Sequence, residues 1–271
     1  MQIGICGCGW LGQPLAQHLK HSGHDIVATR RSPEDLQALT ELGYTSIAYT
    51  LGQSLSSDSL LPLFSSELLI LNIPPGRKSM DPKSFVKQMK GLIAHANSSG
   101  IKHLIFISTT SVYGEQTAPV TEQSPVNPNT DSGSAHILIE ESVFEYYEKR
   151  GTVIRLAGLV GSERHPAKLL AGRTGLKNGE QVVNLIHQQD VIRAITQTIE
   201  KSIWGETLHL AAIEHPSREE YYRWAAAKLA LPAPQFLPSE NPSTGKLIDA
   251  SWSLQKLGLQ LQYASPFDML G

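Results

Sequence analysis

Short apolar runs alternate along this chain with longer stretches in which apolar residues recur every three or four positions. The short runs predict buried strands, and the longer stretches predict amphipathic helices. The predicted strands cover residues 3–6, 24–29, 46–49, 68–73, 103–108, 152–155 and 207–211. The predicted helices cover residues 10–20, 32–42, 82–97, 135–149, 190–201 and 217–231.

This alternation predicts an α/β protein with a doubly wound parallel Rossmann sheet and right-handed crossovers. The central strands have continuous apolar runs, as expected for strands covered on both faces. Residues 51–66 are Ser-rich and are expected to form a loop with one short turn, and residues 232–245 form a Pro- and Ser-rich linker. We expect residues 1–155 to form a cofactor-binding domain, to which residues 186–211 return. Residues 156–185 and 212–271 then form a smaller, irregular C-terminal substrate domain.

Three helix starts have recognisable N-cap residues. Ser32 precedes Pro33 and two acidic residues, and Ser217 precedes two acidic residues, as is typical of a first helical turn. Asp190 is the N-cap expected for the helix over 190–201. The aromatic stripe that contains Tyr221 is interpreted as core.

Composition narrows the classes of partner. The chain has 271 residues, 41% hydrophobic and 18% charged, and a formal net charge of -2, which gives no electrostatic basis for binding nucleic acid. No apolar run approaches the roughly 20 residues that span a bilayer, so no membrane association is expected. Cys6 and Cys8 are the two cysteines, are poorly placed to bridge each other, and have no cluster of ligands suggesting a metal. We expect a reducing, cytoplasmic location and a monomer or homodimer.

The segment GICGCGWLG at residues 4–12 carries the strongest motif. Gly7, Gly9 and Gly12 fit G-x-G-x-x-G between a predicted strand and a predicted helix. In a dinucleotide site the first glycine allows a tight turn, the second admits the pyrophosphate and the third brings the helix close to the strand. Trp10 and Leu11 complete this predicted cofactor loop.

The end of the second strand predicts which cofactor binds. An NAD site needs a carboxylate there for the ribose, but this chain offers Thr29, Arg30 and Arg31. A guanidinium can pair with a 2′-phosphate, so we expect NADP, with NAD less favoured. Solvation of a turn is the alternative role for the two arginines. The predicted cofactor edge also includes the end of the fourth strand, namely Asn72, Ile73 and Pro74.

The fifth strand ends in FISTTSVYG, residues 106–114, and further segments follow: RLAGLVG, ERHP and NLIH. Together they resemble the extended short-chain dehydrogenases/reductases, the group of NAD(P)-dependent epimerases and dehydratases, and are especially similar to its atypical YeeZ-like branch. The resemblance covers nearly the whole chain.

The resemblance implies a Ser or Thr that hydrogen-bonds substrate, which by position is Thr109 with Ser108 beside it. It also implies a Tyr/Lys acid/base pair near residues 132–138, but the sequence of residues 131–138 is DSGSAHIL and has neither residue. His136 is the candidate that remains for proton transfer, and a solvated histidine is the alternative.

Further candidates lie on the substrate side. They are Tyr113, which the resemblance places in a loop, Arg164 and His165 as contacts for an anionic substrate, and His187 beside the cleft. Solvated charge is the alternative for Arg164 and His165. A structural histidine beside a helix cap is the favoured role of His187.

Two functional hypotheses follow. The first is an NADP-dependent oxidoreductase of the epimerase/dehydratase kind, acting on a small polar or nucleotide-sugar-like molecule. The second is a non-catalytic NADP-binding redox sensor or partner-binding protein that lacks the Tyr/Lys pair. The sequence favours an enzyme without establishing its activity.

Overall fold

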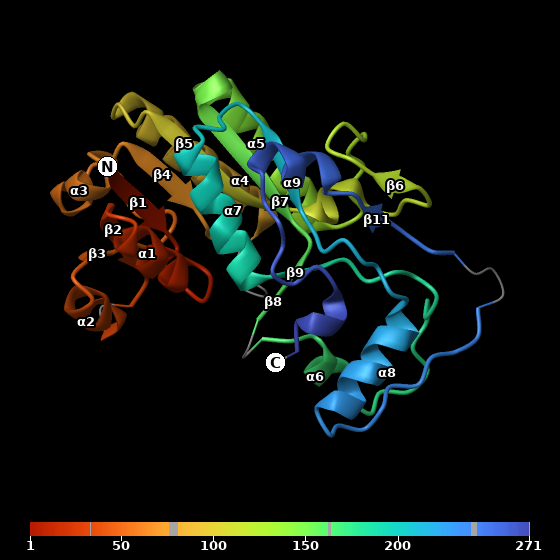
Figure 1. Cartoon of the computed structure of the whole chain (residues 1–271). Coiled ribbons are helices and arrows are strands. Elements are labelled where there is room, and N and C mark those ends of the chain that lie inside the picture. The colour runs from red at the N-terminus through yellow and green to blue at the C-terminus, as the bar shows by residue number, and fades with distance from the viewer. Residues whose placement is uncertain (33, 76–80, 162–163, 240–242, 271) are drawn as a thin grey trace.

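The computed structural model describes residues 1–270 except 33, 76–80, 162–163 and 240–242. Its centre is a seven-stranded parallel sheet in the order β10-β7-β5-β4-β1-β2-β3 (Figure 1). Each of these strands overlaps one of the predicted strands, and the predicted doubly wound parallel sheet is confirmed. The strands are β1 Gln2–Cys6, β2 Asp25–Arg30, β3 Thr45–Ala48, β4 Leu68–Leu71, β5 His103–Thr109, β7 Gly151–Leu156 and β10 Thr207–Leu210.

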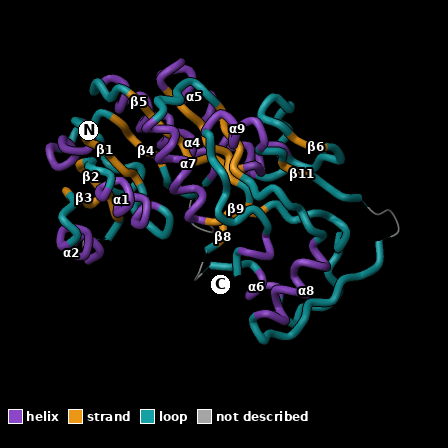
Figure 2. The backbone as a smooth tube through the Cα atoms, in the orientation of Figure 1, coloured by secondary structure: helices purple, strands orange, loops and turns teal. Residues whose placement is uncertain are grey.

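Alternate residues of the central strands pack on opposite faces of the sheet. In β1, Ile3 and Ile5 belong to one buried cluster, and Cys6 belongs to the other. The first cluster includes residues of α1 Gly12–His21, α7 Gln188–Glu200 and α9 Ser251–Leu257. The second includes residues of α3 Leu61–Phe64, α4 Pro82–Ser98 and α5 Asp131–Tyr147. Helices therefore cover both faces, as Figures 1 and 2 show.

The β1–β2–β4 arrangement positions the glycine segment. β1 lies between β2 and β4, with Ile5 in register with Ala28 and Ile70. In a parallel sheet the carboxyl ends of neighbouring strands lie along one edge, and ligands bind outside that edge. The turn after β1 is therefore flanked by the residues that follow β2 and β4. The α2 helix, Glu34–Glu41, connects β2 to β3.

A separate buried cluster is formed by elements that lie beside the sheet in Figure 1. It joins β8 Gly158–Val160, β9 Leu185–His187, α6 Ala167–Leu170 and α8 Arg218–Lys228. Tyr221 is fully buried and its ring contacts those of Trp224 and Phe267, so the prediction that it belongs to a core is confirmed. The short strands β6 Pro119–Val120 and β11 Leu247–Ile248 pair in parallel.

Ser217 caps its helix as predicted, whereas Asp190 does not. The Ser217 hydroxyl accepts a hydrogen bond from Glu220 N at 3.3 Å. At α7 the N-cap is His187, whose Nδ1 accepts from Gln189 N at 3.3 Å. Asp190 is instead buried in the first turn, where its carboxylate accepts the backbone N–H groups of Gln262 and Tyr263 at 2.8 and 2.9 Å.

Two other predicted segments differ in detail. The Ser32 hydroxyl contacts the Glu34 carboxylate, and Pro33 lies outside the described residues. The expected loop over 51–66 contains the 3₁₀ turn η1 Asp58–Leu60 followed by α3. The remaining 3₁₀ turns are η2 Thr110–Tyr113, η3 Glu148–Arg150 and η4 Pro266–Asp268.

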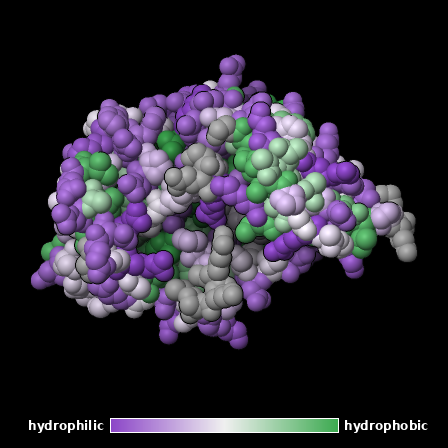
Figure 3. Space-filling model, turned by 90° about the horizontal axis from the view of Figure 1, so that it is seen from below, coloured by the Kyte–Doolittle hydropathy of each residue, from purple (hydrophilic) through white to green (hydrophobic). Residues whose placement is uncertain are grey.

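Among the helices that the structure describes, none has the length and apolar character needed to cross a membrane. The face drawn in Figure 3 is mostly hydrophilic, with hydrophobic side chains gathered in separate patches.

Candidate functional site

The three motif glycines have distinct spatial roles at the end of β1. Gly7 has a φ of +92°, and a Cβ added there would lie 2.3 Å from the Asn72 carbonyl oxygen. A Cβ on Gly12 would lie 2.5 Å from the Gly7 carbonyl oxygen, so α1 packs directly on the turn. A Cβ on Gly9 would meet nothing within 4 Å. Gly9 therefore lies under open space, where a ligand can approach the backbone.

Residues from both neighbouring strands hold this turn. Thr29, at the end of β2, accepts the Gly7 N–H on its hydroxyl at 3.1 Å and the Cys8 N–H on its carbonyl at 3.0 Å. Asn72, after β4, donates its side-chain amide to the Gly7 carbonyl at 3.1 Å. Thr29 is buried, so its hydroxyl positions the turn and does not face the cofactor space.

The start of α1 leaves room for an anion. The N-cap residue is Leu11, whose side chain makes no capping hydrogen bond. Gln13 N–H already bonds to the Gly9 carbonyl at 2.9 Å and Pro14 has no N–H. Within the described residues, the N–H groups of Leu11 and Gly12 are therefore the ones left for an external acceptor, and a phosphate is well suited to that position. Ile73 packs against the core beneath this edge, and Pro74 is exposed on it.

The two predicted ribose-side arginines differ in their surroundings. Arg30 is half-buried and donates from Nη2 to Gln13 Oε1 at 2.9 Å, which places its guanidinium beside the first turn of α1. Its Nη1 lies 4.0 Å from Asp35. Arg31 is exposed. The Arg30 cation is therefore fixed next to the start of α1, and the exposed Arg31 follows it in the chain.

The loop after β8 reaches back to the turn through Trp10. The Arg164 guanidinium lies 5.3 Å from the centre of the Trp10 ring, and a Cβ on Gly161 would contact the same ring. Gln188 Nε2 donates to the Trp10 carbonyl at 2.7 Å. Arg164 thus lies beside the predicted cofactor loop.

At the end of β5, Thr109 and Ser108 point into different environments. Thr109 is half-buried, and its hydroxyl accepts from Ser111 N and donates to Ser111 Oγ, both at 3.1 Å. Ser108 is buried and its hydroxyl donates to Glu140. Thr109 is therefore the residue of this pair that is available at the carboxyl edge.

Ser108 belongs to a buried charged network between α5, β5 and β7. The Glu140 carboxylate receives Nε and Nη2 of Arg155, the latter at 2.6 Å. Arg155 also donates from Nη1 to the Tyr113 hydroxyl at 2.6 Å. That hydroxyl lies 2.5 Å from Nε2 of His209. The other ring nitrogen of His209, Nδ1, donates to the Asp249 backbone carbonyl. We refer to Ser108, Glu140, Arg155, Tyr113 and His209 as the buried network.

Comparisons with known proteins agree with this geometry. The model of the NAD dependent epimerase/dehydratase family matches residues 4–211. Protein YeeZ of Escherichia coli K12 is 34% identical over 270 residues, which are 99% of this chain and 98% of that protein. The chain belongs to the NAD-dependent epimerase/dehydratase family.

Solved structures share the fold of this family member at low identity. The UDP-glucuronic acid 4-epimerase of Bacillus cereus in complex with NAD has a TM-score of 0.81 at 20% identity, covering 99% of this chain and 94% of that one. The UDP-glucose 4-epimerase of Thermotoga maritima with UDP-glucose has a TM-score of 0.81 at 18% identity, covering 97% and 94%.

The segment in which the family resemblance implies a Tyr/Lys pair forms the first turns of α5. His136 is buried there, donates from Nδ1 to the Ser132 carbonyl at 2.7 Å, and stacks on Phe106. Burial lowers the pKa of His136 below its usual range. A neutral histidine with Nδ1 occupied can exchange a proton only at Nε2.

Tyr113 is not on the substrate side. It is fully buried, its hydroxyl is enclosed in the buried network, and burial raises its pKa to about 12. The resemblance places Tyr113 in the loop after β5, and in the structure it is the last residue of the 3₁₀ turn η2. The side chain turns inward because Arg155 and His209 satisfy its hydroxyl.

His165 and His187 also have structural partners. His165 is buried; its Nδ1 accepts from Ala167 N at 3.1 Å and its Nε2 donates to the Tyr221 hydroxyl at 2.7 Å. Burial lowers the pKa of His165 to about 4, so it carries no charge to attract an anion at neutral pH. His187 caps α7 and its ring packs on Tyr263 at 3.8 Å. Of the predicted substrate-side residues, Arg164 keeps an exposed charge.

The cysteines and acidic groups give no further centre. Burial raises the pKa of Cys6 to about 12 and that of Cys8 to about 11, so both are inert thiols. Within the described residues, no group of three His, Cys, Asp or Glu side chains could hold a metal ion.

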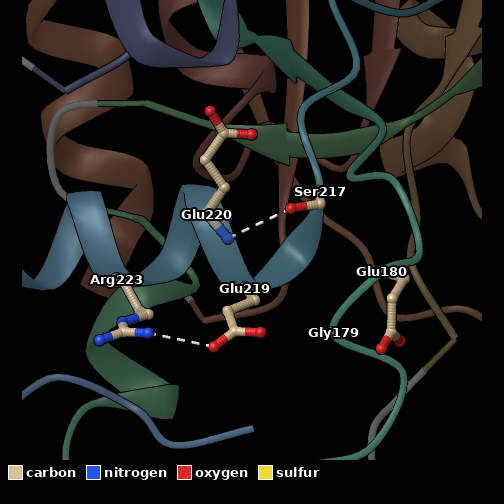
Figure 4. Close-up of a pocket in the computed structure, with 6 residues that line it drawn as sticks. All are labelled: Gly179, Glu180, Ser217, Glu219, Glu220 and Arg223. Carbon is tan, nitrogen blue, oxygen red and sulfur yellow. Dashed lines mark hydrogen bonds and ion pairs between the residues drawn. The ribbon is translucent and has the colours of Figure 1, made fainter. Parts of the chain in front are cut away.

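A cavity of about 570 Å³ at the start of α8 has an acidic lining (Figure 4). Three of its polar side chains have partners, since Arg223 pairs with Glu219 at 3.1 Å and Ser217 caps the helix. The residues predicted for the cofactor or substrate do not line this cavity, and it is not part of the candidate site.

Sequence reasoning missed two groups of residues. The first group is Glu140, Arg155 and His209. Glu140 and His209 lie in ordinary helix and strand patterns, and Arg155 belongs to the RLAGLVG segment. The available signal was the charge of Arg155 within an apolar run that is expected to be buried. Lys246 lies in the C-terminal segment, yet its Nζ donates to the Thr110 carbonyl at 2.9 Å. No local pattern links these two positions.

The glycines provide a matched test of the turn. Gly9→Ala should leave the thermal midpoint nearly unchanged, because its Cβ enters open space, but should weaken dinucleotide binding by about tenfold or more by obstructing the phosphate. Gly12→Ala should instead destabilise the fold, because its Cβ meets the turn backbone. Thermal unfolding and fluorescence titration with NADPH distinguish the two effects. Tight NADPH binding by Gly9→Ala would contradict this assignment.

The buried network should respond asymmetrically to substitution. Arg155→Met leaves the Glu140 charge buried without its partner and should lower the free energy of unfolding by about 3–5 kcal/mol. Adding Glu140→Gln should recover part of this loss. Arg223→Met removes an exposed pair and should cost about 0–1 kcal/mol. Urea unfolding measures all three variants, and equal losses for Arg155→Met and Arg223→Met would refute a structural role for the network.

Proposed function

We propose that this family member is an NADP-dependent oxidoreductase of the epimerase/dehydratase kind that acts on a nucleotide-sugar-like substrate. The observation that carries the proposal is the open space over Gly9, bordered by the start of α1 and by Arg30. A dinucleotide pyrophosphate fits the space over the glycine, and a 2′-phosphate fits a guanidinium. When bound, the nicotinamide would supply the hydride chemistry.

The substrate and cofactor classes are supported by solved structures that share the fold. Bacillus cereus UDP-glucuronic acid 4-epimerase is known in complex with UDP-glucuronic acid and NAD, and WbmH of Bordetella bronchiseptica with NAD+. In this chain Gly7, Gly9, Trp10, Leu11 and Gly12 would form the phosphate loop. Asn72, Ile73 and Pro74 would border the nicotinamide side.

Thr109 would hold the substrate at the carboxyl end of β5. Among the described residues its hydroxyl bonds only to Ser111, two positions along the chain, so a substrate hydroxyl can replace that local partner. Arg164 beside Trp10 would add a positive charge to the same edge. His136 is the titratable candidate for proton transfer on α5, through Nε2. We further propose a cytoplasmic monomer or homodimer, in keeping with the two free, buried thiols.

A non-catalytic NADP-binding sensor or partner-binding protein is the second candidate. The first turns of α5 favour this candidate. They lack the Tyr/Lys pair that the family resemblance implies, and their histidine, His136, is buried with a lowered pKa. Such a protein would bind the dinucleotide and convert no sugar.

Cofactor choice tests the role of the basic pair. Replacing both Arg30 and Arg31 by Ala should weaken NADPH binding by about tenfold to a hundredfold, the effect of one or two charge-assisted hydrogen bonds, and leave NADH binding unchanged. Fluorescence titration of both cofactors measures this, with Arg223→Ala as the control for loss of a surface arginine. Tighter binding of NADH by the wild type, or unchanged NADPH binding by the variant, would refute NADP selectivity.

Turnover tests the role of Thr109. With NADP+ bound, wild-type protein should convert UDP-glucose or UDP-glucuronic acid, and Thr109→Val should lower kcat by about tenfold to a hundredfold through loss of a substrate hydrogen bond. Cofactor affinity should not change, and Thr40→Val on exposed α2 should behave as wild type. Product analysis by chromatography gives the rates. Cofactor binding without conversion of either sugar by the wild type would favour the sensor.

A further inference from the structure

Lys246 brings a cation to the carboxyl end of β5 from a segment far away in the sequence. Its Nζ donates to the carbonyl of Thr110, the residue that follows Thr109, at 2.9 Å. β5 is separated from β1 by β4 alone. The ammonium is therefore at the same sheet edge as the glycine turn, on the side of Thr109.

The backbone that follows the Lys246 side chain is held by Asn184 and by β11. Asn184 donates from Nδ2 to the Lys246 carbonyl at 2.7 Å and accepts the Ile248 N–H on Oδ1 at 2.8 Å. Leu247 and Ile248 form β11, which pairs with β6. Because β6 follows β5 and η2 along the chain, this pairing fixes the lysine relative to the end of β5. Lys246 is thus positioned before any ligand arrives.

The charge of Lys246 is only partly compensated. The side chain is half-buried, and burial lowers its pKa, while Glu115 acts in the opposite direction. Over the described part of the chain, no carboxylate comes within ion-pair distance of Nζ. A carbonyl uses one of the three ammonium N–H groups and leaves the others to solvent or a ligand. Partial desolvation of a cation is costly unless an anion offsets it.

We infer that Lys246 is a substrate-contacting residue whose ammonium binds an anionic oxygen, of a carboxylate or a phosphate, on the molecule held against Thr109. The inference rests on the proposed function, because it assumes that a substrate binds at the end of β5. It also deepens that function, since it makes an acidic group part of what the site recognises. The hydrogen bond to Thr110 orients the ammonium, and the remaining N–H groups contact the ligand.

Competitive acetylation tests this contact directly. The protein, saturated with NADP+, is treated with acetic anhydride alone or with UDP-glucuronic acid, UDP-glucose, glucuronate or inorganic pyrophosphate, and labelling is read by mass spectrometry. When the concentration of a contacting probe is about ten times its dissociation constant, about one site in ten stays free. Acetylation of Lys246 should therefore slow by about tenfold. Exposed Lys228, at the end of α8, should be unaffected.

The probes distinguish the source of the anionic oxygen. Protection by UDP-glucuronic acid and glucuronate indicates a carboxylate, whereas protection by UDP-glucose and pyrophosphate indicates a phosphate. Protection by glucuronate or pyrophosphate without protection by either UDP-sugar would support Lys246 and reject the nucleotide-sugar substrate. If none of the four probes protects Lys246, the inference is overturned.

Substitution separates ligand contact from a purely structural link. Lys246→Met should weaken binding of the protecting probe by about tenfold or more, the worth of a hydrogen bond to a charged group, and Lys246→Arg should restore most of it. NADP+ affinity should stay the same in both variants and in Lys228→Met. A lower thermal midpoint for Lys246→Met with unchanged probe affinity would show that the lysine only ties the C-terminal segment to η2, and would overturn the inference.

Discussion

The turn after β1 is fixed by hydrogen bonds from the strands on both sides of it, and the carboxyl edge of the sheet around Gly9 depends on that constraint. Thr29 from β2 and Asn72 after β4 both bond to Gly7. These bonds hold the turn only if β1, β2 and β4 keep their register, which the buried residues on both sheet faces determine. The open space over Gly9 is therefore a product of sheet packing.

The buried network imposes a second constraint, at the other half of the sheet. Arg155 and Glu140 tie β7 to α5, and their hydrogen bonds engage Ser108 and Tyr113. Ser108 and Tyr113 are close to Thr109 in the sequence, but their hydroxyl groups bond to the buried charges of Glu140 and Arg155. The side chains left to meet a ligand are those that lie at the edge itself, and Thr109 is the clearest of them.

The sequence predicted the sheet well, because strands buried on both faces are mostly continuous apolar runs, as the fully buried β4 is. β7 is buried at every position too, but it accommodates Arg155 because Glu140 and Tyr113 bond to the guanidinium. It also predicted the tight turn at Gly7 and the close packing of α1 at Gly12, while the approach of a pyrophosphate to Gly9 stays a prediction. It did not predict what depends on distant contacts. Ser108 and Thr109 are adjacent and chemically alike, and only their alternating directions along the strand send one inward to Glu140.

The same limit explains the errors at α7 and the omission of Lys246. Asp190 has the chemistry of an N-cap, but its acceptors are used by Gln262 and Tyr263, which lie far along the chain. Two further contacts come from the N-cap and first turn of α7. The His187 ring packs on Tyr263, and Gln188 bonds to Trp10. The start of α7 thus joins the C-terminal segment to the residue beside the glycine turn. Mechanically, residues 187–190 therefore act as one joint, through which a displacement of the C-terminal segment reaches Trp10 beside the glycine turn.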